Sequence, residues 1–204
     1  MTVRMTVQEL RDSGLLKNTR RIPFVDALIP KLDQDLKTET RRPMKYHANG
    51  KRAKCAYGPA GTLLLVTGSH VFLDDHGCLV TDNIHKGLTP MYRTDWQGSP
   101  PLDVGDWRPP MYMPKWSPTR YLISRIVEPA MLWDITEAQA LAEGVEEVSS
   151  GATKFMFPGT KVLFDTAVGA FRHGWNSIHG CRGLYFNTNP EVWRIVVERL
   201  VIDD

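Results

Sequence analysis

The stretch that most limits how this chain can fold is residues 86–118, because it contains ten glycines and prolines. Proline lacks a backbone donor, and glycine loses more backbone entropy on ordering than any other residue. Long helices and strands are therefore excluded there, and we expect an ordered loop or lid, or a flexible insertion. We place this Pro/Gly/aromatic-rich insertion at about residues 74–118 of a single domain, residues 22–204. Residues 1–21 then form an N-terminal extension.

Hydrophobic periodicity predicts regular elements on both sides of the insertion. Apolar runs and alternating patterns indicate strands, whereas apolar residues spaced by three and four indicate helices. We expect strands over residues 62–66, 70–73, 120–127 and 191–202, a hairpin partner at 78–82, helices over 6–17, 24–36, 134–143 and 162–178, and a polar linker over 145–160. Strands and helices do not alternate in βαβ order, so the prediction is an α+β fold with a small β-barrel.

Composition excludes several classes of protein. No run of 18 apolar residues occurs, so we expect no membrane-spanning helix and no membrane partner. The first residues lack the continuous apolar segment of a secretory signal. The cysteines Cys55, Cys78 and Cys181 are odd in number and widely spaced, which argues against a disulfide framework and favours the reducing cytoplasm.

Positive charge is concentrated in one part of the chain, although the net charge is only +2. Residues 37–54 contain seven lysines and arginines and a single acid, Glu39. Such a run attracts phosphate or another anion. The alternative interpretation is a solvated basic loop.

The block from Lys37 to Arg42, KTETRR, offers an amine, two hydroxyls and two guanidiniums within six residues. In an extended strand Thr38, Thr40 and Arg42 share one face, whereas a tight turn brings Lys37 and Thr40 together. A desolvated lysine near other cations loses its proton more readily and can activate a threonine hydroxyl as a nucleophile. The alternative is a basic loop whose threonines bond to the local backbone.

Glu143 is the second candidate catalytic residue. It ends the predicted helix just before Gly144, where the helix dipole disfavours a carboxylate and favours the protonated acid. A protonated carboxyl group suits a general acid. The alternative is an exposed surface glutamate.

A third candidate is the aromatic and basic cluster in the proline-rich stretch, formed by Trp107, Arg108, Tyr112 and Trp116. Aromatic rings interleaved with cations can stack a nucleobase, although packing of the loop onto the core explains them equally well. The six histidines lack metal-ligand spacing, and the chain has none of the common phosphate-binding glycine motifs. We therefore expect neither a metal nor another cofactor.

Several blocks of sequence, in the same order, resemble bacteriophage and prophage proteins that carry an ASCH domain, a branch of the PUA-like superfamily. The blocks are PFVDALIPKLDQDLKTETRRP, RPPMYMPKWSPTRYLISRIVEPAMLWDITEAQALAEGV, FRHGWNSIHG and NPEVWRIVVERL. The resemblance implies a PUA-like β-barrel with flanking helices, a cleft near the KTETRR block, and binding of RNA or nucleotides.

At a finer level the chain is similar to small ASCH enzymes, the N4-acetylcytidine amidohydrolases. Their K-T-x-T-x-R motif is met by Lys37, Thr38, Thr40 and Arg42, and their helix pattern places an acid at Glu143. The resemblance implies that Thr40 is the nucleophile, Lys37 the proton acceptor and Glu143 the proton donor.

The leading hypothesis is an amidohydrolase that removes the acyl group from an N4-acylated cytosine nucleoside or base. In it, Arg41, Arg42 or backbone N–H groups stabilise the oxyanion, and Trp107, Arg108 and Trp116 hold the base together with Thr38. The alternative is a non-catalytic module that binds RNA, a nucleotide or a modified base. A phage structural or assembly factor is a third hypothesis.

Overall fold

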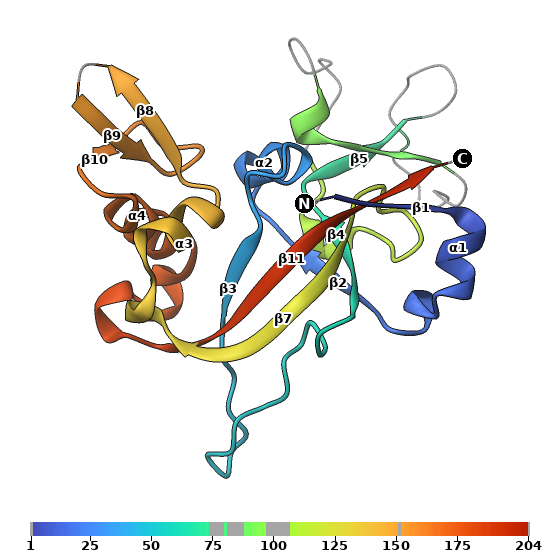
Figure 1. Cartoon of the computed structure of the whole chain (residues 1–204), viewed down its shortest axis with the longest axis horizontal. Helices are drawn as coiled ribbons and strands as arrows, with labels where there is room; N and C mark the ends of the chain where they lie inside the picture. Colours follow the sequence, from blue (N-terminus) through green and yellow to red (C-terminus); the bar gives the residue numbers. More distant parts are fainter. Residues whose placement is uncertain (1, 74–79, 81–87, 97–106, 151, 204) are drawn as a thin grey trace.

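The chain forms a mixed α/β structure around one mixed sheet (Figure 1). The computed structural model describes residues 2–73, 80, 88–96, 107–150 and 152–203. The strands of the main sheet are β1 (Thr2–Thr6), β2 (Thr19–Pro23), β3 (Glu39–Pro43), β4 (Leu63–Thr67), β7 (Tyr121–Met131) and β11 (Glu191–Asp203).

The long strand β11 organises this sheet, whose order is β1-β11-β7-β4-β2. β11 runs antiparallel to β7 from Glu191 to Leu200. It also pairs antiparallel with β3 near its start and parallel with β1 near its end. At the far side β2 runs parallel to β4. The fold therefore contains the predicted mixture of helices and strands.

Two expectations differ from this topology. The described strands follow an open path and form no closed barrel, because β2 pairs with neither β1 nor β3. The segment that we expect to be an N-terminal extension, residues 1–21, instead supplies β1 and most of β2. Its short strands gain their hydrogen bonds from partners far along the chain, which local sequence cannot reveal.

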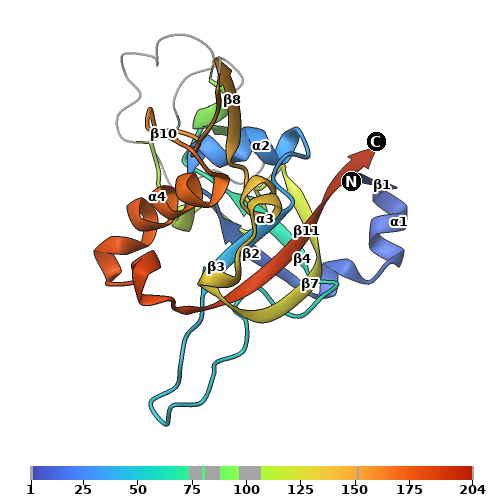
Figure 2. The ribbon, with the colours of Figure 1, turned by 60° about the vertical axis from the view of Figure 1, so that its left-hand side comes forward.

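The sheet is buried on both faces at its centre. In β4, Leu64 and Val66 belong to the main core, whereas Leu63 and Leu65 belong to a smaller cluster with Leu10. Side chains alternate between the faces of a strand, so a strand with four consecutive apolar residues requires cover on both sides. Figures 1 and 2 show α1 (Val7–Asp12) beside β1 and β11, and α3 (Glu137–Ala142) and α4 (Ala167–His179) on the other side of the molecule.

Capping boxes start two of the helices. Thr6 and Glu9 form one at α1, and Thr136 and Gln139 form another at α3. Pro30 lies in the first turn of α2 (Ile29–Asp33), where its missing N–H costs little. The shorter 3-10 helices are Leu15–Lys17, Asp26–Leu28, Arg93–Asp95, Pro110–Tyr112, Leu132–Asp134, Gly180–Arg182 and Phe186–Thr188.

The expected polar linker over residues 145–160 is wrong. β8 (Glu146–Ser150) pairs with β9 (Ala152–Met156), which pairs with β10 (Leu163–Phe164). The polar composition of this segment does not indicate strands, because main-chain hydrogen bonds, and not an apolar pattern, stabilise the hairpin. Phe155 adds a contact with the core.

The described part of the insertion is tied to the core. β5 (His70–Phe72) pairs with β6 (Pro90–Tyr92), and the buried Tyr92 donates its hydroxyl proton to the Val66 carbonyl at 2.8 Å. The expected hairpin partner at residues 78–82 lies, apart from Val80, outside the described residues, as do residues 74–79, 81–87 and 97–106. Among the described residues, no helix is long and apolar enough to cross a membrane.

A long loop, residues 44–57, projects from the end of β3; we call it the basic arm (Figures 1 and 2). The arm closes on itself through the backbone pair of Tyr46 with Arg52 and the bond from the His47 amide to the Lys51 carbonyl. Tyr46 and Arg52 both contact Glu191 at the start of β11, which fixes the base of the arm to the sheet.

Candidate functional site

Five of the predicted site residues line one cavity of about 670 Å³: Lys37, Thr40, Arg41, Arg42 and Glu143. Aromatic side chains of Phe24, Tyr57, Phe157, Phe171, Trp175 and Trp193 also line this cavity. A volume of several hundred Å³ with apolar walls and a few polar groups is typical of a small-molecule site. The cavity therefore combines the candidate catalytic groups with surfaces on which a planar ring can stack.

The backbone around Lys37 is held by three elements. The Lys37 amide bonds to the Lys31 carbonyl of α2 at 3.0 Å, and the Thr38 amide bonds to the Ala142 carbonyl of α3 at 2.9 Å. The Val197 amide of β11 then donates to the Thr38 carbonyl at 2.8 Å. These bonds position Lys37 just before β3 and against the C-terminal end of α3.

Glu143 is the C-cap of α3, as predicted, and Gly144 follows it with a φ of +98°. A side chain at Gly144 would be strained in this conformation, and its Cβ would lie 3.5 Å from the Cβ of Lys37. Glycine therefore ends the helix and allows the two chain segments to approach closely. The consequence is that Glu143 and Lys37, 106 residues apart, face each other.

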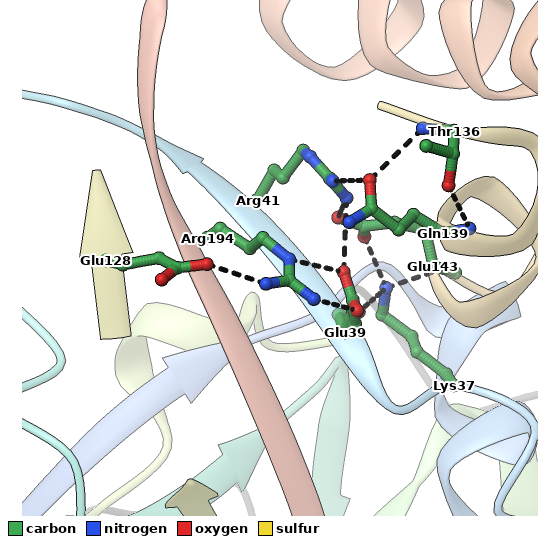
Figure 3. A network of polar contacts seen from close by, with 8 residues as sticks. All are labelled: Lys37, Glu39, Arg41, Glu128, Thr136, Gln139, Glu143 and Arg194. Atoms are coloured by element: carbon green, nitrogen blue, oxygen red, sulfur yellow. Dashed lines mark hydrogen bonds and ion pairs between the residues drawn. The ribbon is translucent and has the colours of Figure 1, made fainter. Parts of the chain in front are cut away.

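Lys37 and Glu143 form a buried ion pair (Figure 3). The Lys37 Nζ lies 2.9 Å from Glu143 Oε2, and it also donates to the Glu143 carbonyl at 2.7 Å and to the Glu39 carbonyl at 2.9 Å. Lys37 is 3% exposed and Glu143 4%. Three acceptors match the three protons of an ammonium group, so the side chain is held in its charged form.

A second cation contacts the same carboxylate. Arg41 Nη1 lies 3.2 Å from Glu143 Oε1 and 3.5 Å from Glu39 Oε2, and its Nη2 donates to the Gln139 side chain at 2.9 Å. Both oxygens of Glu143 thus accept from cations, which fits an ionised carboxylate. This differs from the expected protonated acid, because the helix dipole is a weaker influence than two adjacent positive charges.

Glu39 is a site residue that the sequence reasoning missed. Its carboxylate receives Arg194 of β11 through bonds of 3.0 and 2.5 Å, and Arg194 also bonds to Glu128 of β7 at 2.6 Å (Figure 3). Glu39 is the single acid in the basic run. The alternation of Lys37, Glu39 and Arg41 along one face of an extended segment is the signal that identifies it.

Burial controls the electrostatics of Lys37. Desolvation lowers the pKa of its ammonium group, and the nearby carboxylate of Glu143 opposes this shift. The positive charges of Arg42 and Arg41 add to the lowering of the pKa. The lysine is therefore easier to deprotonate than a lysine in water, as the sequence suggested.

Thr40 is 4% exposed and lines the cavity. Within the described part of the chain, its hydroxyl forms no hydrogen bond with Lys37, since the protons of Lys37 go to Glu39 and Glu143. β3 is extended, so the tight turn that would join the two residues directly is not formed. The structure brings lysine and threonine to one cavity without a direct bond between them.

Arg42 occupies a separate part of the lining. Its guanidinium lies 4.9 Å from the centroid of the Phe24 ring and 5.6 Å from that of Tyr57. His179 and Trp175, whose ring centroids are 4.3 Å apart, line the same cavity from α4. Trp175 lies within the helix predicted over residues 162–178, and its helical spacing does not distinguish a cavity wall from the interior.

The remaining predicted residues do not line this cavity. Thr38 contributes backbone bonds, and the ring of Trp116 lies 5.8 Å from that of Phe72. Arg108 exchanges backbone bonds with His70, and Trp107 is half-buried outside the cavity lining. The described aromatic residues of the proline-rich stretch thus lie outside the lining of this cavity.

No three histidine, cysteine, aspartate or glutamate side chains in the described ranges are grouped to hold a metal ion.

Comparison of the chain with known proteins finds no similar one. No family model, no curated protein and no solved structure matches this chain.

Proposed function

We propose that this protein is an amidohydrolase that removes the acyl group from an N4-acylated cytosine nucleoside or base. The observation that carries the proposal is that Lys37, Thr40 and Glu143 line one aromatic-walled cavity, with the lysine and glutamate in a buried ion pair. This arrangement supplies a nucleophile, a proton acceptor and a proton donor in a space suited to a planar base.

Proton transfer within the ion pair can produce the protonation states that the reaction needs. Transfer of one proton along the 2.9 Å bond from Lys37 Nζ to Glu143 Oε2 gives a neutral amine and a neutral acid. Burial favours such neutral forms, and it already lowers the pKa of the lysine. Entry of a planar base into the cavity displaces water and favours the neutral forms further.

The amine then accepts the hydroxyl proton of Thr40 as the threonine oxygen bonds to the acyl carbon. Arg41, next to Thr40 and lining the cavity, supplies positive charge for the oxyanion. Collapse breaks the bond from carbon to the exocyclic nitrogen, which takes a proton from Glu143. Water hydrolyses the acyl-threonine with the reverse proton movements, so that acid and cytosine amine are the products.

Substitution at Thr40 tests this proposal. We expect wild-type protein to release cytidine from N4-acetylcytidine, and Thr40→Val to lower the rate about a thousandfold or more, since removal of a nucleophile abolishes covalent catalysis. Thr40→Ser keeps a hydroxyl and retains activity. Thr38→Val is the matched control, because Thr38 does not line the cavity. Absence of cytidine release by the wild type refutes the proposal.

One observation favours the non-catalytic alternative, a module that binds a nucleotide, RNA or a modified base. All three protons of Lys37 are already donated to protein acceptors, as in a purely structural lysine. In that case cytidine binds to the cavity with equal affinity in wild-type and Thr40→Val protein, and no acylcytosine is cleaved by either.

A further inference from the structure

The side chains that line the cavity carry more positive than negative charge. Two carboxylates, Asp26 and Glu143, face six cationic side chains, and Glu143 is engaged by two of those cations. The other four form no ion pair with any described residue; they are Arg42, Lys45, Lys54 and Arg182. Only part of the positive charge of this cavity is balanced by the protein itself.

Arg42 is the most buried of these four cations. Its guanidinium has five N–H donors, and it forms one hydrogen bond within the described structure, from Nη2 to the Pro23 carbonyl at 2.6 Å. Its Nε is buried without a partner in the described structure, and the guanidinium contacts the rings of Phe24 and Tyr57. A buried N–H donor without an acceptor raises the free energy of the folded protein. A ligand that supplies the acceptor therefore binds more tightly.

His179 gives a second, independent indication. It is 7% exposed, lines the cavity, and its Nδ1 is buried without a hydrogen-bond partner. Arg42 and Arg182 are both close enough to lower the pKa of this imidazole, in addition to the effect of burial. Arg42 of β3 and Arg182 of the 3-10 helix Gly180–Arg182 line the same cavity as His179, and we call the part of the cavity around His179 its His179 end.

We propose that this end of the cavity is an anion subsite that binds the phosphate of a nucleotide, with Arg42 and Arg182 as its main ligands and Lys45 and Lys54 at its rim. The proposal rests on the proposed function for the base, and it specifies that the substrate is a phosphorylated nucleoside. A phosphate dianion supplies several acceptors and the missing negative charge. The cavity volume suits a single nucleotide.

Direct binding measurements test the subsite without bond cleavage. Calorimetric titration compares cytidine 5′-monophosphate, cytidine and ribose 5-phosphate with wild-type and Arg182→Gln protein. We expect the monophosphate to bind at least about tenfold more tightly than cytidine, since a hydrogen bond to a charged group is worth about that factor. Arg182→Gln lowers this ratio several-fold. Arg172→Gln, an exposed arginine of α4 that does not line the cavity, leaves the ratio unchanged.

The outcomes separate the two proposals. Equal affinity for cytidine and its monophosphate, no binding of ribose 5-phosphate, or a ratio unaffected by Arg182→Gln overturns the anion subsite. If a cytidine trinucleotide binds far more tightly than the monophosphate, the cations bind the backbone phosphates of an oligonucleotide. That result overturns the proposal that the ligand is a single nucleotide. A protein that binds the monophosphate but cleaves no acylcytosine refutes the amidohydrolase and leaves the subsite standing.

Discussion

Acidification is expected to destabilise this protein through one histidine. His179 is buried among cavity residues, and its pKa is lowered from the ordinary 6.5 to about 4 by burial and by the charges of Arg42 and Arg182. Between these two values the unfolded chain binds a proton that the folded chain excludes. The free energy of unfolding therefore falls as the pH falls from about 6.5 to about 4.

The size of the effect follows from the shift. Each unit of pKa difference corresponds to about 1.4 kcal/mol, so full burial would give about 3 kcal/mol, and we expect about 2 to 3 because cavity water screens part of the ring. Urea unfolding of wild-type and His179→Gln protein at pH 7, 6, 5 and 4 measures it. Glutamine does not titrate, so the wild type loses stability relative to the variant as the pH falls.

The control is His47→Gln, because His47 is exposed on the basic arm and does not line the cavity. It shows how the unfolding free energy responds when a histidine away from the cavity is replaced. The reasoning about His179 is refuted if the difference in unfolding free energy between wild type and His179→Gln stays constant, within about 0.5 kcal/mol, across this pH range.

Two further changes test the packing of the site. Glu143→Gln leaves two buried cations without their shared anion, so it should lower the unfolding free energy by about 3 to 5 kcal/mol. Glu146→Gln removes the acid of the more exposed pair with Lys31 and should lower it by less than about 1 kcal/mol. Urea unfolding of the two variants and the wild type measures both effects. Gly174→Ala would place a Cβ 2.2 Å from the Phe157 ring at the cavity wall. It should cost about 1 to 3 kcal/mol, measured as a lower thermal midpoint, and an unchanged midpoint contradicts this contact.

Much of the site could be predicted because its signals are local. The extended form of the KTETRR block places Lys37, Glu39 and Arg41 in one ion network, as strand alternation requires. The glycine after Glu143 likewise marked the end of the helix, where the carboxylate lies.

What could not be predicted depends on pairings between distant segments. Arg194 reaches Glu39 across 155 residues because β11 and β3 are hydrogen-bonded neighbours, and no local pattern specifies that pairing. The same reason explains the missed role of residues 2–23 in the sheet. The aromatic cluster failed for another reason: composition predicts a stacking surface, but loop packing decides which rings reach the cavity, and Trp116 packs on Phe72 instead.

The buried network is better explained by chemistry than by stability. Taking Lys37, Glu143, Arg41 and Glu39 out of water costs several kcal/mol for each charge, and apolar residues of similar size would often be as stable. The bonds to Lys37 also limit where its proton can go. Of its three acceptors two are backbone carbonyls, which do not take a proton, so only the Glu143 carboxylate or a group entering the cavity can receive it. A lysine held in this way keeps its proton available to one acid, and the proposed hydrolysis uses that exchange before the free amine accepts the proton of Thr40.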